Sequence, residues 1–406
     1  MRDIVRMLII TGDVLLAIPV LYLACLSVVA LIRSRHHRSP SPDPERYDKT
    51  FVLLVPAHNE EAGLSRTLAS LNAVEYPRDK RMICVIADNC TDTTALVARR
   101  FPGVQVFERH DTEHRGKGFA LAWGMQQLER TGQLFDGYVV VDADSVVNSG
   151  YLAALARSLA AGARAIQSSN TVLNLATSPS SALRWIAFTL VNHVRQLGRT
   201  GIGGSATLNG TGMCLSRNLL VEHPWNAFGI TEDYQYYLTL VLYGERVAYV
   251  PDAVLNSDMP ESFDQLQSQD VRWETPGDNT SPWKVAGSLI WAGISRRSFV
   301  QLDAAAELLT PQLSVLTACC LVLTVGALLV MSPMLVAGTL LLGALLGFYV
   351  SSAFLLGHPP LAVYLAVAHA PRFVARKLWI LAVVRHLPGR KTNWVRTSRG
   401  RPPGRA

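Results

Sequence analysis

The chain has 406 residues, of which 49% are hydrophobic and 17% are charged, and its formal net charge is +7. The apolar residues gather near both ends and the middle is ordinary in composition, which argues against a fully soluble protein. From Arg372 onward, Lys and Arg are frequent and no acidic residue occurs. A basic tail after apolar segments is typical of the cytoplasmic side of a membrane protein. We therefore expect membrane lipid, and no nucleic acid, among the partners.

The first predicted element is a transmembrane helix over Val14–Ile32, an apolar run just long enough to cross a bilayer. Arg33, Arg35 and Arg38 follow it, so this flank is expected in the cytosol and the amino terminus outside. A signal peptide is the alternative, but the run is long for one and no small-x-small cleavage site precedes the arginines. Residues 1–46 are therefore predicted to be an anchor and a linker.

Residues 47–298 are predicted to form one cytosolic catalytic domain of the α/β class. Four short apolar runs predict buried strands: Phe51–Val55, Arg81–Ala87, Val104–Phe107 and Tyr138–Val141. Helical periodicity lies between or after them, at Glu61–Ala73, Asp92–Arg100 and Lys117–Arg130. Continuous apolar strands that alternate with helices are typical of a parallel sheet covered on both faces.

Residues 299–406 are predicted to form a second membrane region. Two apolar runs, Leu313–Met331 and Met334–Leu356, are separated only by a Ser-Pro turn, as in a helical hairpin. Leu361–Val384 is also apolar, but three basic residues inside it make a full span costly. We expect an amphipathic helix in the membrane interface there, and therefore three spans in all.

Acidic residues follow the predicted strands. Asp88 comes after the second strand, and Asp142 and Asp144 after the fourth. Ligands bind at the carboxyl ends of the strands of open parallel sheets, so these residues predict a shared site. Two carboxylates with one residue between them suit a hard divalent cation, Mg²⁺ or Mn²⁺, that also contacts substrate phosphates. A solvated turn is the alternative for this Asp-x-Asp pair.

Two further motifs open predicted helices. Lys117 lies in the motif Arg-Gly-Lys-Gly, where an amine and backbone N–H groups can meet an anion. Glu232 and Asp233 begin the other helix, and one of them is a candidate general base. The alternative is that Thr231 is an ordinary N-cap, followed by acids that suit the first turn.

A last motif combines Gln269, Arg272 and Trp273 within about one helical turn. Arginine can bind a phosphate through two hydrogen bonds, and tryptophan can form the apolar wall of a sugar site. Taken alone, the Arg-Trp pair favours the alternative, a surface charge beside a core aromatic.

In this order, the motifs resemble glycosyltransferase family 2, in the branch of the cellulose, chitin, hyaluronan and poly-N-acetylglucosamine synthases. The resemblance covers roughly Phe51–Trp273. It rests on Pro56-Ala57-His58-Asn59-Glu60-Glu61, Asp88, Arg115-Gly116-Lys117-Gly118, Asp142-Ala143-Asp144, Thr231-Glu232-Asp233 and Gln269-x-x-Arg272-Trp273.

The resemblance implies a GT-A fold, in which a Rossmann-like nucleotide-binding half is merged with an acceptor-binding half, and a UDP-sugar donor. The residues implied to hold the uridine are Ala57, Glu60 and Asp88, with Lys117 near the nucleotide. The residues implied to bind the diphosphate are Asp142 and Asp144, the latter through the metal. Asp233 would be the catalytic base with Glu232 beside it. The residues implied to hold diphosphate and acceptor are Gln269, Arg272 and Trp273.

The predicted function is therefore an inverting membrane glycosyltransferase that extends a polysaccharide at the cytoplasmic membrane face. A single-sugar transferase acting on a lipid-linked acceptor is the alternative, because the segment Asn209–Met213 departs from the polymerase patterns and few spans follow the catalytic domain. Gly201–Ala206 also fits a dinucleotide-binding G-x-G-x-x-A motif, but no apolar strand precedes it. A catalytically inactive membrane scaffold conflicts with the intact acidic and basic motifs.

Overall fold

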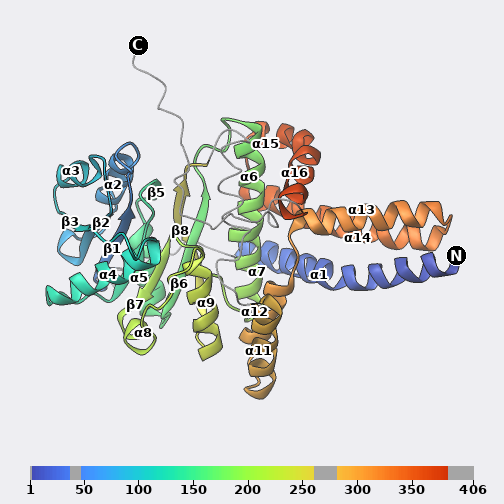
Figure 1. Ribbon diagram of the computed structural model, residues 1–406, viewed down its shortest axis with the longest axis horizontal. Helices are drawn as coiled ribbons and strands as arrows, with labels where there is room; N and C mark the ends of the chain where they lie inside the picture. Colours follow the sequence, from blue (N-terminus) through green and yellow to red (C-terminus); the bar gives the residue numbers. More distant parts are fainter. Residues whose placement is uncertain (1, 37–46, 260–280, 383–406) are drawn as a thin grey trace, which may run out of the picture. The chain divides into compact units, whose positions relative to one another are not determined.

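The computed structural model describes residues 2–36, 47–259 and 281–382. They form two compact units, one of helices and one built on a sheet (Figure 1). The helical unit contains residues 2–36, 182–204 and 281–382, and the sheet unit contains residues 47–181 and 205–259. Two parts of the predicted catalytic segment, 182–204 and 281–298, thus group with the helical unit.

The sheet has eight strands in the order β3-β2-β1-β4-β7-β6-β8-β5. The strands are β1 (Phe51–Ala57), β2 (Arg81–Asp88), β3 (Val104–Arg109), β4 (Gly137–Val140), β5 (Ser145–Val147), β6 (Ala165–Val172), β7 (Met213–Ser216) and β8 (Val247–Ser257). The first four strands pair in parallel, as predicted. The other half is mixed: β7 is antiparallel to both β4 and β6, β5 is antiparallel to β8, and β6 is parallel to β8.

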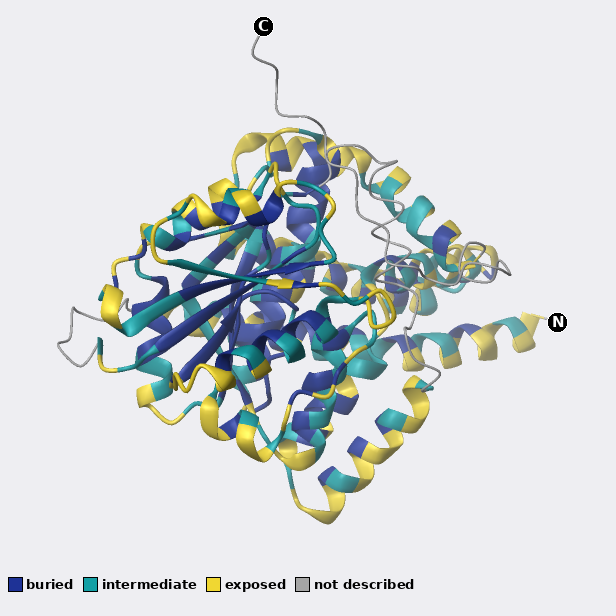
Figure 2. Cartoon of the chain, turned by 60° about the vertical axis from the view of Figure 1, so that its left-hand side comes forward, coloured by how far each residue is buried: buried dark blue, intermediate teal, exposed yellow. Residues whose placement is uncertain are grey.

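Helices cover both faces of the parallel half, as predicted, because β1 and β2 carry apolar side chains on both sides. On one face, Phe51, Leu53 and Val55 join a core with residues of α2 and α5. On the other, Ile86 of β2 packs against Gly124 of α4. Figure 2 shows the strands largely in the colour of buried residues. This double burial explains why the strands read as unbroken apolar runs.

The remaining elements of the sheet unit are short and follow the strands closely. They are α2 (Leu64–Asn72), η2 (Arg78–Lys80), α3 (Thr94–Arg99), α4 (Lys117–Arg130), α5 (Tyr151–Ala160), α8 (Arg217–Glu222) and α9 (Glu232–Tyr243). The helix α6 (Pro179–Thr189) begins in this unit and continues into the helical one. The predicted helices α2 and α3 begin two or three residues later than their periodicity suggested, because loops fill the strand ends.

In the helical unit, α1, α13 and α14 contact one another and run side by side (Figure 1). The elements are α1 (Arg2–His36), η3 (Leu190–Val194), α7 (Arg195–Gly201), α11 (Pro282–Ser295), α12 (Phe299–Leu309), α13 (Leu313–Leu329), α14 (Pro333–Gly357), α15 (Leu361–Ala366), η4 (Val367–His369) and α16 (Ala370–Ala382). The segment predicted as one interfacial helix, Leu361–Val384, is thus divided among α15, η4 and α16 as far as the structure describes it.

Two described helices, α1 and α14, are long and apolar enough to cross a membrane. The remaining predicted span, Leu313–Met331, forms the shorter helix α13. This helix is long enough to cross a membrane only together with α12, from which it is bent by 63°. Counting this bent pair as one span gives three, the predicted number. The helix around the first predicted span extends well beyond it on both sides, to Arg2 and His36.

Buried ion pairs join the helices of this unit. Arg199 of α7 contacts Asp303 of α12 at 2.8 Å, and neither side chain is exposed. Tyr22 of α1 donates a hydrogen bond to the same aspartate at 2.9 Å. One helical turn away, Arg195 contacts Glu307 at 2.9 Å. Charges buried among apolar helices are costly unless paired, so this network fixes α7 against α12.

Candidate active site

The amine of Lys117 is the centre of the candidate site. Its Nζ lies 2.5 Å from Oδ1 of Asp142 and donates a hydrogen bond of 2.6 Å to the carbonyl oxygen of Gly210. Oε1 of Glu232 lies 3.9 Å from the same nitrogen. Lys117 thus meets three other segments of the chain. Three of the four residues, Lys117, Asp142 and Glu232, were predicted as site residues.

The contributing charged side chains lie at or near the ends of elements. Lys117 is the first residue of α4, and Asp142 follows β4 at its carboxyl end. Glu232 and Asp233 form the first turn of α9, where the partial positive charge of a helix N-terminus favours carboxylates. Thr231 occupies the N-cap position of α9 but makes no side-chain capping hydrogen bond there.

Gly210 brings the backbone close to the catalytic candidates. Its φ is +74°, and a methyl group in place of its hydrogen would lie 3.0 Å from Oδ2 of Asp233 and 3.4 Å from Nζ of Lys117. A side chain here would be strained by the backbone conformation and would press on both residues. The departure of Asn209–Met213 from the polymerase patterns therefore falls next to the predicted base.

The glycine after Lys117 also has a packing role. Gly118 lies against the backbone carbonyl of Ala227, and its own carbonyl accepts a hydrogen bond of 3.1 Å from the indole of Trp225. Gly118 is thus needed for close packing of α4 against the segment before α9. The predicted approach of this motif's backbone N–H groups to an anion stays a prediction.

Burial and neighbouring charges shift the pKa values of Glu232, Asp233 and Lys117 at the centre. Burial, reinforced by the charge of Asp233, raises the pKa of Glu232 from 4.5 to about 8. Burial also raises the pKa of Asp233, although the charge of Lys117 opposes the rise. The pKa of Lys117 is raised as well, because Asp142 and Glu232 outweigh the opposing effect of burial. Near neutral pH the amine is therefore charged, and the paired carboxyls of α9 hold protons unusually tightly.

The predicted uridine-binding residues lie at the ends of β1 and β2. Ala57 and Ala87 are register partners on these parallel strands. Asp88 ends β2, and its carboxylate contacts the buried guanidinium of Arg109 at 2.7 Å. Burial raises the pKa of Asp88 despite this contact. The backbone N–H of Glu60 is fixed by the hydroxyl of Thr94 at 2.8 Å.

Three residues for which the sequence predicted no role hold these strand ends. Asn59 and Asn89 both have positive φ, 56° and 50°, a conformation that asparagine tolerates better than most residues. Oδ1 of Asn89 accepts the N–H of Asp111 at 2.9 Å, and Asn59 does the same for Thr91 at 2.8 Å. Arg109, on the third strand, also had no predicted role. The available signal was the position of Asn89 directly after an apolar strand and of Asn59 two residues after another.

Asp144, the predicted metal ligand, lies two residues beyond Asp142 and accepts a hydrogen bond of 3.2 Å from Ser145. The N–H of Asp142 is held by Oγ1 of Thr211 at 3.0 Å. The alternative of a merely solvated turn is disfavoured, because Asp142 also pairs with Lys117. Gln269, Arg272 and Trp273 lie outside the described residues.

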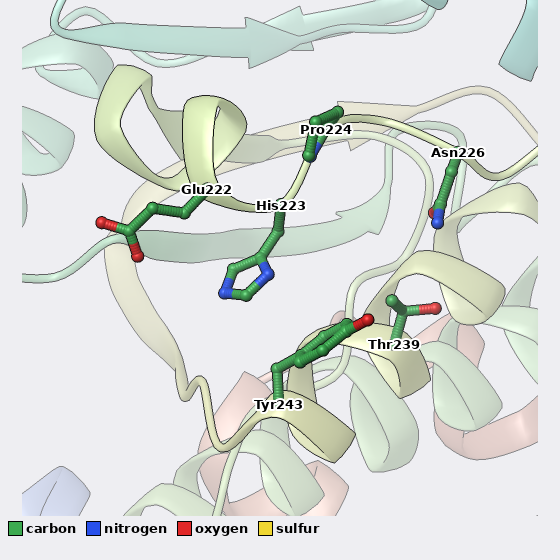
Figure 3. A pocket seen from close by; sticks show the side chains of 6 residues that line it. All are labelled: Glu222, His223, Pro224, Asn226, Thr239 and Tyr243. Atoms are coloured by element: carbon green, nitrogen blue, oxygen red, sulfur yellow. The ribbon is translucent and has the colours of Figure 1, made fainter.

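A cavity of about 180 Å³ between α8 and α9 is lined by Glu222 and His223, among others (Figure 3). These two residues and Glu245 bring their ligand atoms within 4.8 Å of one another, a spacing that a metal ion could use. Arg164, however, contacts Glu222 at 2.6 Å and Glu245 at 2.5 Å. The guanidinium already supplies the positive charge, so this cluster is an ion-pair network.

The sequence profile of the family described as "Glycosyltransferase like family 2" matches residues 48–275, more than half of the chain. The chain belongs to this family. The match includes all three motifs of the described centre and also the Gln-x-x-Arg-Trp motif. The predicted family is thereby confirmed.

The curated relatives share about a quarter of their aligned residues with this chain. "Probable glycosyltransferase YdaM" of Bacillus subtilis is 25% identical over 232 residues, which are 54% of this chain and 53% of the relative. "Poly-beta-1,6-N-acetyl-D-glucosamine synthase" of Staphylococcus aureus is 25% identical over 230 residues, 56% of this chain and 54% of the relative. The chain thus spans about half the length of the curated relatives it matches. A solved mannosyltransferase of Pyrobaculum calidifontis, in complex with GDP-Man and Mn²⁺, is 18% identical with a TM-score of 0.47, covering 84% of this chain and 98% of that one.

Proposed function

We propose that the chain is a membrane-anchored, inverting glycosyltransferase that takes its sugar from a nucleotide sugar. The observation that carries the proposal is the gathering of Asp142, Glu232 and Asp233 around the single amine of Lys117, beside the carboxyl end of β4. Such a centre offers a buried carboxyl that can act as a base, and further carboxylates that can bind a cation. Membership of the family supports the reaction class.

The proposed domain has a GT-A arrangement with the nucleotide on its parallel half. Residues at the ends of β1 and β2, namely Ala57, Glu60 and Asp88, would hold the uridine of a UDP-sugar. The mixed half, which carries Gly210 and leads to α9, would face the acceptor. Gln269, Arg272 and Trp273 are proposed to hold the diphosphate and the acceptor.

Asp233 is the proposed general base. Glu232 has a pKa of about 8, so near neutral pH it keeps its proton in most molecules and cannot accept another. Asp233 is the neighbouring carboxyl, and burial raises its pKa, which makes its carboxylate form a stronger base than that of an exposed aspartate. It would take the proton of the acceptor hydroxyl as the oxygen attacks the anomeric carbon from the face opposite the diphosphate. The bond to the diphosphate breaks with its electron pair, and the configuration inverts.

Asp144 and Asp142 are the proposed ligands of Mg²⁺ or Mn²⁺. The residues fit such a cation, because carboxylate oxygens are hard ligands and the centre has three carboxyls for one amine. A bound cation would neutralise charge on the departing diphosphate. Lys117, which already contacts Asp142, is placed to add a second positive charge beside the same group.

The acceptor is proposed to be a growing polysaccharide at the cytoplasmic membrane face. Gln-x-x-Arg-Trp and the similarity to a poly-N-acetylglucosamine synthase support a polymer. A lipid-linked acceptor that receives one sugar is the second candidate. It is favoured because Gly210, beside the proposed base, belongs to the segment that departs from the polymerase patterns.

One experiment tests the activity, the metal and the acceptor together. Membranes containing the full chain are incubated with a panel of radiolabelled nucleotide sugars, and lipid-soluble products are separated from high-molecular-weight polymer. We expect transfer from a UDP-sugar, loss of transfer in chelator and recovery with Mn²⁺ or Mg²⁺. Asp144→Ala should be inactive but folded and membrane-bound. Full transfer in chelator would remove the metal from the mechanism, and absence of transfer from every donor would contradict the proposed function.

A further inference from the structure

The helix α11 (Pro282–Ser295) has three distinct sides. One side is buried and consists of Ala286, Leu289 and Gly293. Leu302 of α12 lies against Gly293, so this side faces the neighbouring helix. The sequence had assigned α11 to the catalytic domain and predicted no membrane contact for it.

The second side is apolar and yet exposed to solvent. Trp283 is 75% exposed, Trp291 is 74% exposed and Ile294 is 64% exposed, and Ile290 is 38% exposed between them. The spacing of these four residues, with 3.6 residues per turn, places them in one stripe along the helix. An exposed stripe with two tryptophans is unusual on a surface that meets only water.

The third side is polar. Lys284, Ser288 and Ser295 are exposed, and their spacing of four and seven residues aligns them in a second stripe, next to the apolar one. Two exposed arginines, Arg296 and Arg297, follow the helix directly. The helix α11 thus has one side packed against protein, one exposed apolar side and one exposed polar side.

The direction of the neighbouring helix fits a position along a membrane surface. α12 is bent by 63° from α13, the apolar helix that follows it. If α13 runs across a bilayer, α12 lies closer to the plane of the bilayer than to its normal. Figure 1 shows α11 and α12 running across the common direction of α1, α13 and α14.

We propose that the stripe of Trp283, Ile290, Trp291 and Ile294 binds the headgroup–acyl boundary of an anionic bilayer. This inference rests on the membrane location in the proposed function. Tryptophan is enriched at this boundary, because its ring is apolar and its N–H remains near water. Lys284 and the two arginines after the helix match anionic headgroups. The adjacent polar stripe favours lipid over a second copy of the chain, because a boundary leaves that stripe in water.

Tryptophan quenching by brominated lipid tests the proposal directly. The full chain is placed in nanodiscs containing anionic lipid, either plain or brominated near the headgroup end of the acyl chains. The quenched part of the emission is compared between the natural chain and Trp283→Phe/Trp291→Phe. We expect the double variant to lose about half or more of the quenched emission. Trp123→Phe, in α4 of the sheet unit, is the matched control and should lose none of it.

Two results would overturn the proposal. One is an unchanged quenched emission in the double variant, which would mean that neither indole meets lipid. The other is the absence of quenching together with a stable dimer that the double variant breaks, which would assign the stripe to a second copy. Because quenching needs no turnover, an inactive chain that is still quenched would contradict the proposed enzyme and leave this membrane surface intact.

Discussion

Asp233 and Glu232 are adjacent in the sequence but differ in their contacts. Glu232 faces the amine of Lys117 at 3.9 Å, whereas Oδ2 of Asp233 lies beside Gly210 in the segment proposed to face the acceptor. A general base contributes about 10²–10⁴-fold to turnover. We predict that Asp233→Asn, which keeps the shape but cannot take a proton, lowers kcat by about this factor. Steady-state kinetics and calorimetric binding of the nucleotide sugar provide the measurement.

Glu232→Gln is the matched variant, and we expect a milder loss because Glu232 is already protonated in most molecules near neutral pH. The affinity for the nucleotide sugar should change little in either variant. Near-normal turnover of Asp233→Asn would contradict its role as the base. A defect confined to nucleotide binding would contradict it equally.

The raised pKa of Glu232 also predicts a pH-dependent stability. Its pKa is about 8 in the folded chain against an ordinary value of 4.5, so between these values the folded state holds a proton that the unfolded state releases. The free energy of unfolding therefore falls as pH rises through this window. Glu232→Gln removes the effect, and we expect the variant to gain stability over the natural chain from about pH 4.5 to 8. Thermal unfolding in chelator at pH 5 and pH 8.5 measures the gain.

Glu129→Gln, at an exposed position of α4, is the control for replacing a carboxylate by an amide. Its difference from the natural chain should be similar at both pH values. A Glu232→Gln variant that is less stable than the natural chain at pH 8.5 would show that the contact with Lys117 outweighs the cost of burial.

At the scale of helices, the pair Arg199–Asp303 decides how α7 and α12 pack. Removal of one partner of a buried pair leaves an uncompensated charge and costs about 3–5 kcal/mol. We predict this loss of unfolding free energy for Arg199→Met, and a clearly smaller loss for Arg199→Met/Asp303→Leu, which removes both charges. Denaturant or thermal unfolding of the purified protein measures both.

Arg99→Met provides the comparison, because it breaks an exposed pair with Glu108, whose side chains are 48% and 39% exposed. Exposed pairs contribute about 0–1 kcal/mol, so this variant should be nearly neutral. If the double variant of the buried pair were as unstable as the single one, packing and not charge would explain the loss.

At the scale of the whole molecule, the distribution of basic residues predicts the topology. Arginines follow the first span and the basic residues after Arg372 follow the last, so both regions are expected in the cytosol, with three spans and the amino terminus outside. Cysteines introduced into the basic tail should resist a membrane-impermeant reagent applied to intact cells, whereas Arg2→Cys should react. Ready labelling of the tail would contradict this topology.

The sequence by itself determined the parts whose signals are local. Unbroken apolar runs predicted β1 to β4, because parallel strands covered on both faces need apolar side chains on each side. The order of short motifs predicted the family and identified Lys117, Asp142, Glu232 and Asp233. The long apolar runs predicted the helices α1 and α14, since bilayer thickness sets their length. The roles of Gln269, Arg272 and Trp273 stay predictions, because they lie outside the described residues.

Only the tertiary structure decided which distant residues meet. No local pattern indicates that the carbonyl of Gly210 accepts a hydrogen bond from Lys117, or that Arg109 pairs with Asp88. These contacts depend on how strands and loops are placed in space. The four strands of the mixed half, β5 to β8, were not predicted. The strands β5 and β7 have only three or four residues and carry little periodicity. The stripe on α11 was hidden for a related reason. A helix packed on one side and apolar on another has the same composition as an ordinary core helix, and only the fold shows which side is left open.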